Sequence, residues 1–259
     1  MIQLLFNKFI KIVHFTSLDV VFGALAYQSY FYYFFYHELP PLAYITGLFS
    51  GIWMVYLLDR KWDTILKQIP DERHQFQMEN KTFINVILIL LIILGGISAL
   101  YLPKEIIQYG MGLVLYIFIY WILLPLFKAR NWNYIKEFLT ASIYAFGVLL
   151  VSWLHHSNIH LIYLYALFTL LVWHHLCLFE VLEKPKRFFY HSLLKIIEFL
   201  WFGILIIFVI LQEVAWWELL PLFISMIFQL YIHYFYHNLK SRFWAEMAYL
   251  SPIIYFTFL

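Results

Sequence analysis

The chain has 259 residues, of which 64% are hydrophobic and only 12% are charged. About 25% of the residues of a typical soluble domain are charged, so this composition excludes an ordinary water-soluble domain and makes a lipid bilayer the expected surrounding. The net charge of +2 is too small to indicate binding to nucleic acid, and a single cysteine, Cys177, excludes a disulfide framework.

Nine apolar stretches approach the length of roughly 20 residues that a membrane-spanning helix needs. They cover residues 12–34, 41–58, 82–102, 106–127, 136–154, 160–179, 190–211, 217–236 and 243–259. Because strands can cross a bilayer only as a closed barrel, the sequence predicts an all-α polytopic bundle of about nine transmembrane helices in one domain, 1–259. Residues 12–127 and 136–236 each hold four stretches and suggest a four-helix pseudo-repeat, with a ninth span after it.

The basic residues are distributed unevenly between the two ends of these stretches. All lysines and arginines except Lys104 and Lys195 lie at the amino terminus or in the connections after the second, fourth, sixth and eighth stretches. Connections rich in lysine and arginine stay on the cytoplasmic side of a membrane. The pattern therefore predicts an integral membrane protein, in a bacterial inner membrane, with a cytoplasmic amino terminus.

Acidic pairs follow the second and the sixth apolar stretches. Asp59 and Asp63 are four residues apart, and Glu180 and Glu183 are three apart, so each pair would share one face of a continued helix. Facing carboxylates could hold Mg²⁺ together with phosphate oxygens and water. Basic side chains that could bind the phosphates are Arg60, Arg73, Lys128, Arg130, Lys136, Lys184 and Lys186. The alternative interpretation is a set of solvated helix ends at the membrane surface.

Two acidic residues lie inside apolar stretches. Asp19 falls in the first stretch, where a carboxylate should face the bundle interior or water, so it could line a chamber or form a hydrogen bond between helices. Glu198 lies three residues after Lys195, and this spacing predicts an ion pair along one helix.

Several histidines resemble fragments of the histidine boxes of membrane di-iron oxygenases: His155, His156, His174, His175, His233 and His237. The predicted topology puts the first two at the outer surface and the last two near the inner surface. One iron site cannot collect ligands from both sides of a roughly 30 Å hydrocarbon core. We therefore expect these residues to be interface or core histidines.

The chain resembles the UbiA superfamily of intramembrane prenyltransferases in its nine stretches, its cytoplasmic amino terminus and its two acidic motifs. The first family motif, N-D-x-x-D-x-x-x-D, aligns with V-Y-L-L-D-R-K-W-D, which keeps Asp59 and Asp63 but has Val55 and Tyr56 in place of Asn and the first Asp. L-F-E-V-L-E-K-P-K stands in for the second motif. The family's Y-x-x-x-K falls on residues 124–128 and keeps only its lysine, Lys128.

This resemblance implies a Mg²⁺-dependent transfer of an isoprenyl group from a diphosphate donor to a lipophilic acceptor. Asp59, Asp63, Glu180 and Glu183 would hold the metal, with Asp59 and Asp63 as the catalytic pair, and the basic residues would neutralise the departing diphosphate. Two alternatives on the same scaffold are a terpene-cyclase-type enzyme and a non-catalytic protein that binds an isoprenoid or a partner enzyme. A transporter fits less well, because transporter sites place charges at the bilayer midplane and these cluster at one surface.

Overall fold

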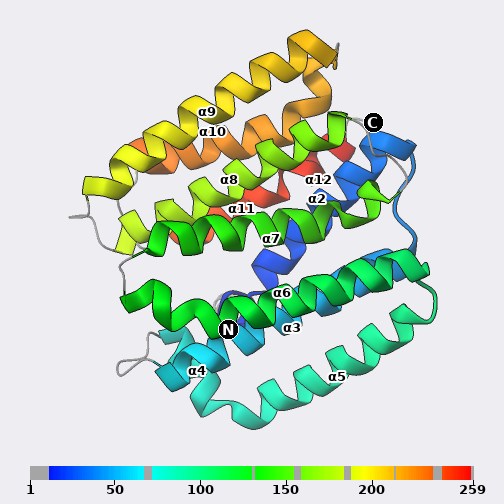
Figure 1. The fold of residues 1–259 in the computed structure, drawn as a ribbon, viewed down its shortest axis with the longest axis vertical. Helices are drawn as coiled ribbons and strands as arrows, with labels where there is room; N and C mark the ends of the chain where they lie inside the picture. Colours follow the sequence, from blue (N-terminus) through cyan, green and yellow to red (C-terminus); the bar gives the residue numbers. More distant parts are fainter. Residues whose placement is uncertain are drawn as a thin grey trace, which may run out of the picture. The chain divides into compact units, whose positions relative to one another are not determined.

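The structure is a computed structural model that describes residues 12–66, 72–129, 132–154, 159–183, 188–212, 214–235 and 241–257. Every regular element in these ranges is a helix, as the sequence predicts, and they contain no strand (Figure 1). The α-helices are α2 (Leu18–Tyr36), α3 (Leu42–Leu66), α4 (Glu72–Glu79), α5 (Lys81–Ala99), α6 (Lys104–Ala129), α7 (Asn133–Trp153), α8 (Ile159–Glu183), α9 (Phe188–Gln212), α10 (Leu220–Phe235), α11 (Ser241–Met247) and α12 (Ser251–Phe256). Two short 3₁₀ helices are η1 (Trp216–Leu219) and η2 (Ala248–Leu250).

Seven helical segments in the described part of the chain are long and apolar enough to cross a membrane. They are Leu42–Trp62, Lys81–Ala99, Lys104–Leu124, Asn133–Trp153, Ile159–Glu183, Phe188–Leu211 and Trp216–Phe235. Each corresponds to one of the nine predicted spans, from the second to the eighth. This set of helices is compatible with an integral membrane protein built as a helical bundle.

The first predicted span, 12–34, is not one continuous helix. The helical residues 12–15 are followed by a turn at Thr16 and Ser17, and Ser17 has the left-handed φ of 61° that is uncommon outside glycine. The helix α2 starts again at Leu18, so the turn breaks the predicted span near its beginning.

The last predicted span, 243–259, is also interrupted. Here α11 has only 7 residues and α12 only 6, and the 3₁₀ helix η2 lies between them. Pro252 stands in the first turn of α12, where its missing N–H costs no helical hydrogen bond. Neither α2 nor this broken segment is among the seven candidate spans.

The chain divides into two compact units, and the boundary between them falls inside α2. The first unit comprises Met1–Leu25 and Pro40–Leu102, and the second comprises Ala26–Leu39 and Pro103–Leu259. In the first unit α3 packs against α5 through a cluster of buried side chains: Leu57, Ile84, Leu88 and Leu91. At the other end of this interface the hydroxyls of Thr46 and Ser98 are 2.7 Å apart.

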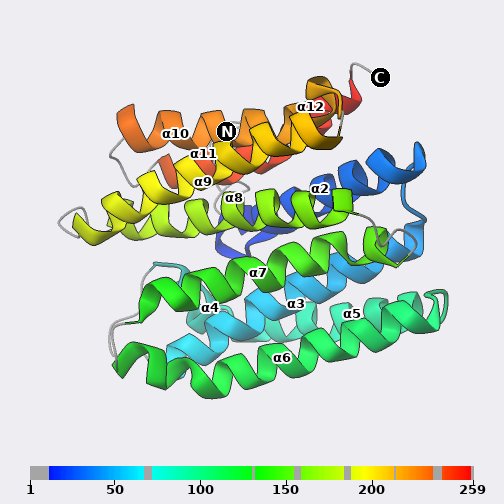
Figure 2. The same cartoon turned by 45° about the horizontal axis from the view of Figure 1, so that its top comes forward.

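The second unit is organised around α8. Figures 1 and 2 show α7, α8 and α9 running side by side, with α8 in the middle. Two thirds of the α8 span is buried, which is the largest share for any of the seven spans, whereas only 6% of the α6 span is buried. Exposed apolar residues on a long helix are expected where the surrounding is lipid instead of water.

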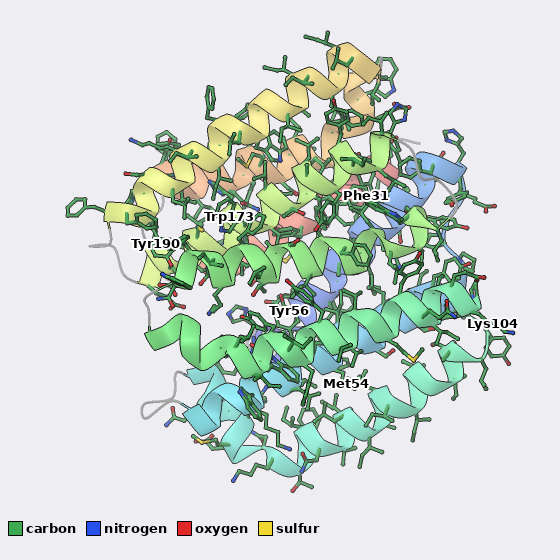
Figure 3. The ribbon with its side chains drawn as sticks, viewed as in Figure 1. Phe31, Met54, Tyr56, Lys104, Trp173 and Tyr190 are labelled. Carbon is green, nitrogen blue, oxygen red and sulfur yellow. The ribbon has the colours of Figure 1, made fainter. Side chains whose placement is uncertain are left out.

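Aromatic packing fastens the second half of α2 to the same unit. Phe31, labelled in Figure 3, meets Phe168 of α8 edge to face with ring centroids 5.1 Å apart. Tyr27 is fully buried, and its hydroxyl donates to the hydroxyl of Ser225 at 2.7 Å. The hydroxyls of Ser225 and Ser251 lie 2.8 Å apart, so α2, α10 and α12 share one polar contact within an apolar core.

Candidate functional site

The first acidic pair lies on the last turns of α3. This helix is continuous from Leu42 to Leu66, so Asp59 and Asp63 are one helical turn apart, as predicted. The side chain of Asp59 is half-buried, and the segment that is apolar enough to cross a membrane ends at Trp62, between the two acids. The pair therefore lies where a candidate membrane-spanning segment ends.

Arg60, which the sequence predicted to bind a diphosphate, already makes a structural contact. Its side chain is buried, and its guanidinium donates to the backbone carbonyl of Phe15. Trp53, two turns earlier on α3, donates its indole N–H to the carbonyl of Thr16 at 2.8 Å. These carbonyls lie where the helical residues 12–15 end, so α3 supplies donors to carbonyls that have no partner within that helix.

The second acidic pair lies at the end of α8, where Glu180 is half-buried and Glu183 is exposed. The structure adds a third carboxylate that the sequence reading missed. Glu137, on the first turns of α7, is only 6% exposed and lies close enough to Glu180 and Glu183 for their charges to act on it. Lys136, a predicted diphosphate-binding residue, places its Nζ 3.7 Å from Oε1 of Glu137.

Asp19 has a local role and lies in the first turn of α2, just after the break in the predicted first span. Its Oδ2 is 2.6 Å from Nδ1 of His14, on the other side of the turn at Thr16 and Ser17. Its Oδ1 accepts the N–H of Val20 at 3.0 Å. The contact with His14 joins two helical segments that are neighbours in the chain, and both partners lie within five residues of Asp19.

The remaining predicted residues fall outside what the structure describes. Arg130, Lys184 and Lys186 lie in ranges that it does not describe, as do His155, His156 and His237. For Asp63, Arg73 and Lys128 the backbone is described as helical but the side chains are not. The predictions for all of these residues therefore stay predictions.

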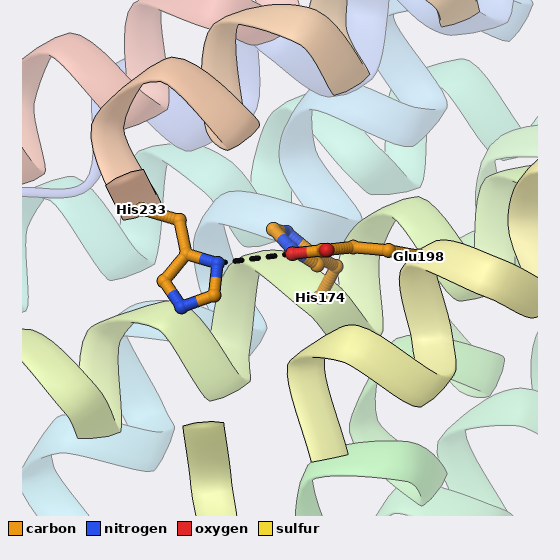
Figure 4. Close-up of side chains that lie close together, drawn as sticks. All are labelled: His174, Glu198 and His233. Carbon is orange, nitrogen blue, oxygen red and sulfur yellow. Dashed lines mark hydrogen bonds and ion pairs between the residues drawn. The ribbon is translucent and has the colours of Figure 1, made fainter. Parts of the chain in front are cut away.

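A different group of polar side chains comes together inside the second unit. His174 of α8, Glu198 of α9 and His233 of α10 place one ligand atom each within 4.8 Å of one another (Figure 4). His174 and His233 are buried, and Glu198 is only 8% exposed. Oε1 of Glu198 lies 3.2 Å from Nε2 of His174 and 2.9 Å from Nδ1 of His233. Tyr234 donates its hydroxyl to Oε2 of Glu198 at 2.9 Å.

This arrangement corrects the prediction for Glu198. The predicted ion pair with Lys195 does not form, and Lys195 is exposed while Glu198 faces the two imidazoles. Lys195 and Glu198 are only three residues apart on α9. Packing of α9 against α8 turns Glu198 toward His174 and His233 instead of toward Lys195. The sequence signal that could have found the group was the presence of an acid and two histidines in three consecutive apolar stretches.

A second histidine–glutamate pair lies next to this group. Nε2 of His175 is 3.2 Å from Oε2 of Glu246 on α11, and both residues are buried. Among the described residues, one imidazole contacts Glu246, whereas two contact Glu198. The pair of His175 and Glu246 can therefore serve as a control for the group of His174, Glu198 and His233.

Comparison of the chain with protein-family models, with curated proteins and with solved structures found no match.

Proposed function

We propose that the chain is an integral membrane enzyme that transfers an isoprenyl group from a diphosphate donor to a lipophilic acceptor, with Mg²⁺. The observation that carries this proposal is that two candidate membrane spans, α3 and α8, each end in an acidic pair. The pair on α8 is joined by a buried carboxylate, Glu137, and by Lys136. The motif resemblance to the UbiA superfamily rests on the same two helix ends.

The charge balance at the end of α8 supports a bound cation. A buried carboxylate is costly unless it is paired, and Glu137 has Lys136 at 3.7 Å with two further carboxylates close by. The described residues thus bring three carboxylates and Lys136 together at the end of α8. Mg²⁺ prefers oxygen ligands and usually combines one or two carboxylates with substrate phosphates and water, so a diphosphate with its metal would complete such a site.

The proposed roles follow from charge and position. Mg²⁺ would stabilise the negative charge that develops on the leaving diphosphate. Lys136 and the other predicted basic residues would neutralise the same charge from the protein side. The apolar helices would hold the isoprenyl chain and exclude water, which would otherwise react with the allylic cation before the acceptor does.

Release of pyrophosphate by the purified protein tests the proposal. The protein in detergent is supplied with Mg²⁺, isoprenyl diphosphates of several chain lengths and lipophilic acceptors, and pyrophosphate is measured with and without the acceptor. We expect release only when metal, donor and acceptor are all present. Asp59→Asn and Glu180→Gln should lower the rate, whereas Glu105→Gln should not, because Glu105 is an exposed acid on the first turn of α6 and belongs to neither pair.

The other outcomes separate the alternatives. Release without any acceptor would identify a cyclase-type reaction and overturn the transferase proposal. No release with any donor, together with donor binding that Asp59→Asn leaves unchanged, would identify a non-catalytic isoprenoid-binding protein. Equal losses in Asp59→Asn and Glu105→Gln would mean that the acidic helix ends have no special role.

A further inference from the structure

We propose that His174, Glu198 and His233 bind one divalent transition ion of the Zn²⁺ type, at a site separate from the acidic helix ends. The three residues come from α8, α9 and α10, three helices of the second unit. His174 is fully buried, and Glu198 and His233 are 8% and 4% exposed, so little of the group is accessible. Figure 4 shows the three side chains close together. The proposal does not depend on the prenyltransferase activity.

Hydrogen bonds fix the proton on one side of His174. The hydroxyl of Tyr249 donates to the backbone carbonyl of Leu171, which can only accept, and itself accepts an N–H of Gln229. This turns Oε1 of Gln229 toward Nδ1 of His174, at 2.8 Å. Because an amide oxygen only accepts, Nδ1 carries the proton, and in a neutral imidazole Nε2 presents a lone pair.

That lone pair faces an acceptor. Nε2 of His174 lies 3.2 Å from Oε1 of Glu198, and the same oxygen faces Nδ1 of His233 at 2.9 Å. A neutral imidazole and a carboxylate cannot form a hydrogen bond with each other through two lone pairs. A positive charge is therefore needed between them, and either a proton or a metal ion would supply it.

The number and spacing of the ligands favour a metal. Ligands about 2.0–2.1 Å from a tetrahedral ion are about 3.3 Å apart, close to the two separations around Glu198. One imidazolium is enough to balance the charge of one buried carboxylate. Glu198 has two imidazoles on one oxygen, and two histidines with one carboxylate are a common ligand set for zinc and for non-haem iron, leaving a position open for water or substrate.

The surrounding residues match the outer shell of a metal site. Metal-binding histidines usually donate their second ring N–H to an oxygen that fixes their orientation, and Gln229 accepts such a bond from His174. Tyr234 donates to the second oxygen of Glu198 and so leaves Oε1 to the ion. Two imidazole nitrogens exclude Mg²⁺ as the preferred ion, because Mg²⁺ selects oxygen ligands.

Metal binding by the full-length chain tests the proposal directly. The protein is purified in detergent without a polyhistidine tag, stripped with a chelator and titrated with Zn²⁺ against a competing chromophoric chelator, and bound zinc is counted by elemental analysis. We expect one tightly bound Zn²⁺ per chain, retained in excess Mg²⁺. Glu198→Gln and His233→Gln should each weaken Zn²⁺ binding by at least about 10-fold, the lower end of the loss seen even for outer-shell changes.

The matched control is His175→Gln, which alters a buried histidine that also faces a glutamate but does not belong to the group of three. His175→Gln should leave Zn²⁺ affinity unchanged. Asp59→Asn should also leave it unchanged, and this result would show that the Zn²⁺ site is distinct from the proposed Mg²⁺ site. Failure of the wild-type chain to bind Zn²⁺ would overturn the proposal and identify a buried imidazolium–carboxylate pair instead, whether or not the variants fold. An equal loss of affinity in His175→Gln would overturn it as well.

Discussion

Replacement of Glu198 by leucine should destabilise the metal-free protein by about 2–5 kcal/mol. The carboxylate is the partner of three groups: Nε2 of His174 at 3.2 Å, Nδ1 of His233 at 2.9 Å and the hydroxyl of Tyr234 at 2.9 Å. Hydrogen bonds within membrane proteins contribute about 0.6 kcal/mol on average and up to about 1.7 kcal/mol. Three such bonds give about 2 kcal/mol at the average value and about 5 kcal/mol at the upper value.

The burial of His174 favours the upper end of the range of about 2–5 kcal/mol given above for Glu198→Leu, about 3–5 kcal/mol. His174 is fully buried, so water cannot replace its lost partner, and breaking a buried ion pair by removing one member costs about 3–5 kcal/mol. Glu198→Gln keeps one accepting oxygen and should cost about half as much as the leucine variant. Both values are free energies of unfolding, obtained by titrating chelator-treated protein with SDS in mixed micelles.

A double-mutant cycle isolates the contribution of one contact. Glu198→Leu, His233→Leu and the double variant should show a coupling of about 0.5–3 kcal/mol, because the two side chains share a hydrogen bond at 2.9 Å. Glu105→Gln, on the exposed first turn of α6, should change stability by no more than about 0.5 kcal/mol. A cost for Glu198→Leu as small as that of Glu105→Gln would refute the three-partner network.

Three further predictions concern other parts of the two units. Asp59→Asn should weaken Mg²⁺-dependent donor binding, measured as a dissociation constant, by about 10-fold or more, whereas Glu79→Gln on α4 should leave it unchanged; equal effects would contradict a special role for Asp59. Gly95→Ala should lower thermal stability while Gly96→Ala does not, because a Cβ at Gly95 would lie 3.1 Å from a side-chain oxygen of α3 and one at Gly96 meets nothing within 4 Å. Tyr27→Phe should cost only about 1 kcal/mol in the same SDS titration, since the two serine hydroxyls that face it keep each other and backbone carbonyls as partners, and a loss above about 3 kcal/mol would contradict this.

The amino-acid sequence predicted the helices well where long apolar runs are bounded by polar residues. The second to eighth predicted spans all correspond to helices that could cross a membrane, because the length of an apolar run and its flanking charges are local properties. The first and last runs were predicted less well. Their residues are apolar enough, but the left-handed backbone at Ser17 and the 3₁₀ helix η2 interrupt them, and neither feature has a strong signal in composition.

The candidate sites show the same difference between features set by local sequence and features set by packing between helices. The pairing of Asp59 with Asp63 depends only on helical periodicity, so the sequence by itself determined that one turn of α3 would carry both acids. Periodicity also suggested Lys195 for Glu198, and there it was wrong. A buried carboxylate bonds to the polar groups that packing brings to it, and these come from α8 and α10, 24 and 35 residues away along the chain. Only the tertiary structure could decide which helix faces meet, because the side-chain partners of Glu198 belong to neighbouring helices and not to its own.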